Sequence, residues 1–188
     1  MRCFCEDEDG NILIGTKGSG IKLLNPATKE LTDYLNESKG LISNSVYALR
    51  RNKANDIFIG TEGNGINILN VATGRLEKLE IPDKYPPFKA VYNIYFTNND
   101  SLLWVGTSGY GLIKINISRE QGRYHVKGFR QYNSSDKNIS LNNDVVYAIT
   151  SDPEDNMLWF GTRGGGLNCI NMKDNSIKSL EDMDSRIL

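Results

Sequence analysis

A glycine-rich segment with the pattern Gly-Thr-x-Gly-x-Gly is the first part of the chain whose residue types suggest chemistry. It occurs, for example, in "GTKGSGIK" (15–22) and in "GTSGYGLIK" (106–114). Glycine-rich loops can hold phosphate groups when a Lys-Ser/Thr pair and a helix N-terminus follow. Here Ile21 stands where that lysine belongs, and the chain continues into another short apolar run. The sequence therefore argues against nucleotide binding and favours a turn between two strands.

Other residues that form catalytic or metal sites are sparse in this chain. The acidic turn "EDEDGN" (6–11) lacks the full ligand spacing and the distal Glu of a calcium loop, and favours a hairpin turn. The one histidine, His125, cannot supply a metal cluster, and no nucleophile elbow accompanies it. Cys3 and Cys5 should point to one face of a strand without a mutual disulfide, and Cys169 should serve packing. We therefore predict no catalytic residue, no metal site and no cofactor.

The glycine segment belongs to a unit that the chain repeats four times. Its first glycine is Gly15, Gly60, Gly106 or Gly161, so successive copies start 45, 46 and 55 residues apart. An apolar block such as "VYALRR" (46–51) precedes each of the last three copies, and "MRCFCE" fills this position in the first. A period in this range indicates a tandem repeat architecture.

Each unit predicts four short strands. Runs of β-branched and aromatic residues bounded by glycine are typical of buried strands. The tails of the repeats partly alternate apolar and polar residues, which suits outer strands with one solvent-exposed face. We predict an all-β fold, a β-propeller built of four-stranded antiparallel blades with the "VYAI" blocks as inner strands. The chain should be a single propeller segment, 1–188, with blades at approximately 1–40, 41–85, 86–140 and 141–188.

Two details of the repeats carry further expectations. Trp104 and Trp159 lie in the second strands of their units, where we expect them to pack between blades. The third repeat is nine residues longer than the first two between its third strand and the next inner strand. We expect this insertion in the outer hairpin and its exit, where added residues are tolerated and often contact partners.

The repeats resemble the two-component regulator propeller repeat. The resemblance is carried by "LWVGTSGYGLIKIN" (103–116) and by the lead-ins "GLISNSVYAL" (40–49) and "ISLNNDVVYAI" (139–149), and it extends over nearly the whole chain. It implies the periplasmic sensor region of a bacterial hybrid two-component protein of the Bacteroides type, whose histidine kinase and DNA-binding parts lie elsewhere. It also implies that these four blades are a fragment of a seven-bladed propeller.

We therefore expect a non-catalytic, ligand-sensing module that responds to an oligosaccharide in the periplasm. A propeller enzyme acting on glycans, as a lyase or hydrolase, and a protein–protein interaction scaffold remain open alternatives. The ligand is expected at the blade end with the glycine turns, because the frame is constant there while the residues inside it vary. The candidate ligand-binding residues are Lys17, Glu62, Asn64, Tyr110 and Arg163. Tyr110 could stack on a sugar ring, and Lys17 and Arg163 could hold a carboxylate or sulfate.

The composition limits the partners. The 188 residues carry a formal net charge of −1, so the chain has no excess of positive charge that would attract nucleic acid or an anionic membrane. No run of about 20 apolar residues spans a bilayer, and no signal peptide is visible. Exposed faces of the first and last blades predict self-association, unless the remaining blades of a longer parent cover them.

Overall fold

The computed structural model of the chain describes residues 1–63, 65–136, 141–152, 154 and 156–180, which form four antiparallel sheets of four strands each. The first sheet contains β1 (Cys3–Glu6), β2 (Ile12–Gly15), β3 (Ile21–Asn25) and β4 (Glu30–Leu35). The second contains β5 (Val46–Arg51), β6 (Ile57–Thr61), β7 (Ile66–Asn70) and β8 (Arg75–Lys78). The third contains β9 (Val91–Thr97), β10 (Leu102–Thr107), β11 (Leu112–Glu120) and β12 (Arg123–Tyr132). The fourth contains β13 (Val146–Asp152), β14 (Met157–Thr162), β15 (Leu167–Asn171) and β16 (Ile177–Ser179).

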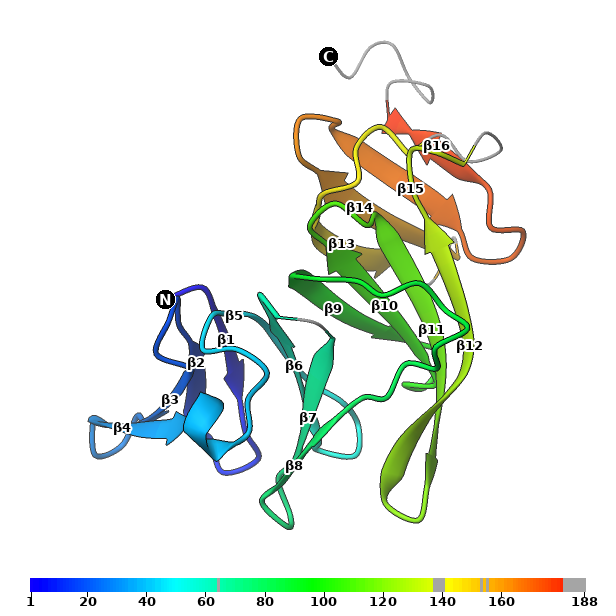
Figure 1. The fold of residues 1–188 in the computed structure, drawn as a ribbon. Coiled ribbons are helices and arrows are strands. Elements are labelled where there is room, and N and C mark those ends of the chain that lie inside the picture. The colour runs from blue at the N-terminus through cyan, green and yellow to red at the C-terminus, as the bar shows by residue number, and fades with distance from the viewer. Residues whose placement is uncertain (64, 137–140, 153, 155, 181–188) are drawn as a thin grey trace.

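The strands follow their sequence order across every sheet, and neighbouring strands pair antiparallel. Beyond the strands, the described residues include one short 3₁₀ helix, Glu37–Lys39, which ends at Gly40 with a left-handed φ of 99°. The predicted all-β fold and the predicted strand order are both confirmed. Figure 1 shows the sheets side by side as the blades of an open arc, with the first and fourth blades at its two ends.

The hydrophobic core lies between the blades rather than inside any one of them. One cluster joins Leu13 and Ile21 of the first blade to Val46 and Ile57 of the second. The other two clusters join the second blade to the third and the third to the fourth. A four-stranded sheet has two faces, so each inner blade needs a neighbour on either side to cover them.

Both tryptophans lie on blade faces, but only Trp104 is covered. Trp104 is fully buried in the cluster between the third and fourth blades, as predicted. Trp159 holds the equivalent position in the fourth blade and is only half-buried. Leu167, whose equivalent Leu112 is fully buried, is 40% exposed on the same blade. The fourth blade therefore presents a face that the described residues leave open.

The remaining sequence expectations concern cysteines, the acidic turn and the insertion. Cys3 and Cys5 both pack against the first core cluster, so they share one face of β1, and all three cysteines are free. The acidic turn is a hairpin turn in which Asp7 Oδ1 accepts the backbone N–H groups of Asp9 and Asn11. The insertion lengthens β11 and β12 into a long hairpin, visible in Figure 1 below the body of the third blade.

Candidate functional site

Each glycine segment forms the hairpin turn between the second and third strands of its blade. In the first blade, Thr16 Oγ1 donates to the Gly20 carbonyl at 2.9 Å and accepts from the Ser19 N–H at 2.9 Å. Gly20 has φ 67°, and an added Cβ would lie 2.1 Å from the Leu35 carbonyl oxygen, so this position requires glycine. The turn leads into the strand β3 and not into a helix, as the sequence predicts.

The same turns are fastened to the segment that leads into the next blade. The N–H groups of Gly18 and Gly20 donate to the Asn44 carbonyl at 3.0 and 2.8 Å, just before β5. Gly109 and Gly111 make the same two bonds to Asp144, just before β13. The turns and the links between blades therefore share one end of the propeller, as the alternating strand directions predict.

The first glycine of each segment is where adjacent blades come closest. A Cβ at Gly60 would lie 2.6 Å from Val91 Cγ1, and a Cβ at Gly106 would lie 2.7 Å from the Val146 carbonyl oxygen. Gly161, the equivalent in the fourth blade, would meet only Ala148 of its own blade, at 4.0 Å. The glycine therefore makes room for the first valine of the next inner strand.

The predicted ligand-binding residues are distributed unevenly over this end. Lys17, Glu62 and Arg163 are exposed. Tyr110 is half-buried and packs against the core between the second and third blades, so its ring is partly occupied. Asn64 lies outside the described residues. The role of all five in binding stays a prediction.

A row of tyrosines lines the inner strands, and our interpretation of the sequence did not identify it. Tyr47, Tyr92 and Tyr147 are the second residues of β5, β9 and β13. The Tyr47 and Tyr92 rings meet edge to face at 4.9 Å, and the Tyr92 and Tyr147 rings stack at 5.2 Å. Arg2 holds the equivalent position in the first blade, with its guanidinium 4.8 Å from the Tyr47 ring centroid. We call Arg2, Tyr47, Tyr92 and Tyr147 the tyrosine row.

The tyrosine row borders a shallow cleft of about 290 Å³ whose walls are the inner strands. Tyr147 is 51% exposed, so an aromatic surface is open to solvent there. On the same wall, the Arg50 guanidinium lies 4.9 Å from the Tyr95 ring centroid. The Tyr95 hydroxyl lies 3.0 Å from Ser151 Oγ, and this hydrogen bond lowers the pKa of Tyr95. Aromatic faces beside a few polar groups are the usual composition of a small-molecule site.

The row also approaches the glycine turns. Partial burial raises the pKa of Tyr47, and the nearby carboxylate of Glu62 raises it further. Glu62, one of the five candidate ligand-binding residues, therefore lies close to the inner strands. A signal for the row was present in the sequence, since "VY" begins three of the four inner strands. The strand pattern alone did not show which way the tyrosines face.

Comparison with solved structures shows the fold. The extracellular domain of the putative hybrid two-component system BT4673 from B. thetaiotaomicron superposes with a TM-score of 0.72 at 18% identity, over 96% of this chain and 25% of that one. The extracellular domain of BT3049 from the same organism gives a TM-score of 0.56 at 18% identity, over 95% of this chain and 28% of that one. The β-propeller domain of Cps50 (Swd1) from Myceliophteria thermophila gives 0.63 at 14% identity, over 94% and 53%.

The chain has a β-propeller fold, and its structural neighbours include the class of protein that the sequence repeats resemble. It spans about a quarter of the length of the two-component proteins' extracellular domains. No protein-family model and no curated protein sequence matches it. Within the described ranges, we find no group of three His, Cys, Asp or Glu side chains placed to hold a metal ion, and no helix with the length and apolar character of a membrane span.

Proposed function

We propose that the chain is part of an extracellular ligand-sensing module of a bacterial two-component protein, and that its ligand is an oligosaccharide in the periplasm. The tyrosine row carries this proposal. It presents three aromatic rings and a guanidinium along the inner strands of four successive blades, beside a cleft open to solvent. A pyranose ring has apolar faces lined by C–H groups and a rim of polar hydroxyls, and such a surface can contact both parts.

The architecture suits sensing because the inner strands belong to different blades. A sugar that contacts Tyr47, Tyr92 and Tyr147 touches three blades at once. A sugar that binds one arrangement of the blades more tightly than another shifts the protein toward that arrangement. A longer protein can transmit this change in blade packing. In this proposal the parent carries further propeller blades and a histidine kinase, and the segment itself performs no chemistry.

A propeller enzyme acting on glycans and a protein–protein interaction scaffold are the alternatives that the experiment separates. Oligosaccharides are screened by thermal shift and on a glycan array, and each one bound is incubated with the protein and analysed for cleavage products. Binding without product supports a sensor, whereas product formation supports an enzyme. Absence of sugar binding leaves the scaffold as the better account.

Variants assign the binding to the row. We expect Tyr92→Ala and Tyr147→Ala to abolish the thermal shift produced by the sugar. Tyr85→Ala is the matched control, since Tyr85 is also half-buried and stacks on Phe129 at 4.9 Å, but lies in the connection between β8 and β9. Equal loss in all three variants would mean that the effect is on folding and not on the site.

A further inference from the structure

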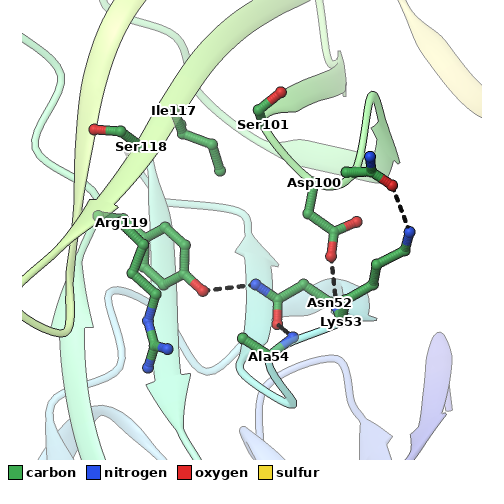
Figure 2. Close-up of a pocket in the computed structure, with 10 residues that line it drawn as sticks. Asn52, Lys53, Ala54, Asp100, Ser101, Ile117, Ser118 and Arg119 are labelled. Atoms are coloured by element: carbon green, nitrogen blue, oxygen red, sulfur yellow. Dashed lines mark hydrogen bonds between the residues drawn. The ribbon is translucent and has the colours of Figure 1, made fainter.

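The long β11–β12 hairpin forms one wall of a second cleft, at the opposite end of the blades from the glycine turns. This cleft has a volume of about 340 Å³. Figure 2 shows Ile117, Ser118 and Arg119 of the hairpin on one side, facing Lys53 and Asp100 on the other. The opposite wall comes from the β5–β6 turn of the second blade and the β9–β10 turn of the third.

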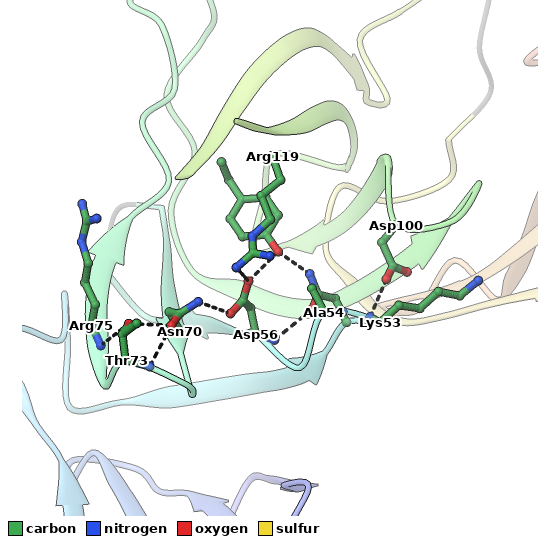
Figure 3. A network of polar contacts seen from close by, with 10 residues as sticks. Lys53, Ala54, Asp56, Asn70, Thr73, Arg75, Asp100 and Arg119 are labelled. Atoms are coloured by element: carbon green, nitrogen blue, oxygen red, sulfur yellow. Dashed lines mark hydrogen bonds and ion pairs between the residues drawn. The ribbon is translucent and has the colours of Figure 1, made fainter. Parts of the chain in front are cut away.

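A buried carboxylate holds the hairpin in place. Asp56 is 1% exposed, and its Oδ2 accepts from the Tyr124 hydroxyl at 2.7 Å and lies 3.2 Å from Arg119 Nη2. Its Oδ1 accepts from Asn70 Nδ2 at 2.7 Å, and Figure 3 shows Arg119 and Asn70 converging on this carboxylate. The Asn52 side chain completes the network by donating to the Tyr124 hydroxyl at 2.6 Å.

The arrangement joins a carboxylate of the second repeat to the long hairpin of the third, and neither feature recurs at the equivalent positions of the other repeats. The position of Asp56, four residues before the first glycine, holds Asn11, Leu102 and Met157 elsewhere. The third and fourth strands of the other blades have three to six residues, against nine and ten in β11 and β12. Among the residues that the structure describes, the buried carboxylate of Asp56, which is costly to desolvate, is the one that the arginine and tyrosine of the long hairpin satisfy.

The cleft walls combine apolar surface with polar and charged side chains, and hydrogen bonds join the two turns. The Lys53 N–H donates to Asp100 Oδ2 at 2.5 Å, and Lys53 Nζ donates to Asn99 Oδ1 at 2.7 Å, so the two turns are tied together. Arg119 pairs with Asp56, whereas the Lys53 ammonium donates to the neutral Asn99 side chain and Asp100 accepts from the Lys53 backbone N–H. On the hairpin side, Ile117 and the Tyr124 ring supply apolar surface. The cleft therefore presents hydrogen-bond donors and acceptors, charged groups of both signs, and an aromatic face.

We propose that this cleft is a second binding site, for a neutral sugar of one or two rings. Its volume lies in the range of small-molecule sites, and sugar hydroxyls both donate and accept, as a wall with Lys53, Asn99 and Asp100 requires. A carboxylate on the sugar would be repelled by Asp100 and would have to compete with Asp56 for Arg119, so a neutral sugar suits the cleft better. The ligand class rests on the proposed function, but the site is separate from the tyrosine row.

The test is an NMR titration of the whole chain with glucose, galactose, mannose and maltose, with glucuronate as the charged counterpart. We expect the neutral sugars to shift the backbone amides of Ala54, Asn99 and Ser118, and glucuronate to leave them unchanged. Ala54→Trp should fill the cleft and abolish these shifts. Ala27→Trp is the matched control, because both alanines are exposed turn residues whose N–H groups donate to an asparagine two residues earlier.

The outcomes separate this proposal from the proposed function. Shifts confined to the tyrosine row overturn the second site and leave the sensor intact. Shifts confined to the cleft support the second site and count against binding at the row. If no neutral sugar shifts the cleft amides, if glucuronate shifts them as much, or if Ala54→Trp retains the shifts, the second site is wrong.

Discussion

Substituting alanine for the first glycine of a repeat tests how the blades pack, because the chain contains its own control. Gly60→Ala places a methyl group 2.6 Å from Val91 Cγ1 and 2.8 Å from the Val91 carbonyl oxygen, both in the next blade. Gly161→Ala places the same group where only Ala148 Cβ of its own blade lies near, at 4.0 Å. Neither glycine has a left-handed φ, so the two substitutions differ in space and not in backbone strain.

The magnitude follows from those distances. Contacts below 3.0 Å force a shift, and the neighbour at Gly60 includes backbone, which cannot rotate away. Overpacking of this kind costs about 1–3 kcal/mol of the free energy of unfolding. At Gly161 the methyl group makes an ordinary contact, and alanine reduces the entropy of the unfolded chain, so we expect a change between about zero and 1 kcal/mol in the stabilising direction.

Urea denaturation of dilute protein, followed by tryptophan fluorescence, measures both variants. Trp104 is buried between the third and fourth blades and reports on blade separation. Gly106→Ala should resemble Gly60→Ala, since its methyl group would lie 2.7 Å from the Val146 carbonyl oxygen. Equal free energies of unfolding for Gly60→Ala, Gly106→Ala and Gly161→Ala would refute the view that these glycines are there to admit the next blade.

Three further predictions concern the network, the thiols and the open blade face. Asp56→Ala should lower the free energy of unfolding by about 1.5–3 kcal/mol because it removes charge-assisted hydrogen bonds from a buried site, and a urea midpoint equal to that of the parent would contradict this. Burial raises the pKa of the Cys3 thiol from its ordinary value of 9.0 to about 12, so the folded state keeps a proton that the unfolded state releases. Stability should therefore fall as the pH rises from about 9 toward 12, and Cys3→Ala should flatten that slope in urea titrations. Sedimentation velocity should show concentration-dependent association that Leu167→Lys weakens; a clean monomer at all concentrations would rule the association out.

The sequence predicts the fold well because the fold is local and repeated. A glycine that recurs with the same neighbours is expected to have the same structural role in each repeat. The four copies therefore allow Gly15, Gly60, Gly106 and Gly161 to be interpreted together. The strand order follows from short connections, and the absence of a following helix already argues against a phosphate site. The structure then supplies the reason for the repeat, which is the approach of the next inner strand.

The sites are less predictable because they depend on contacts between repeats that differ from one another. The pairing of Asp56 with Arg119 and Tyr124 joins two blades and has no periodic signal. The sequence placed the insertion of the third repeat in the outer hairpin, where β11 and β12 are long, but it gave no sign of the contacts that this hairpin makes with the second blade. The direction of the Tyr92 side chain depends on how its inner strand packs beside the neighbouring inner strands, and the pattern of apolar residues leaves this undetermined.

A crystal structure of the chain grown with the oligosaccharide that gives the largest thermal shift is the most direct test of the sensor account. The account predicts an intact sugar lying against Tyr47, Tyr92 and Tyr147 on the inner strands. A sugar found cleaved, or bound with these three rings left bare, would contradict it.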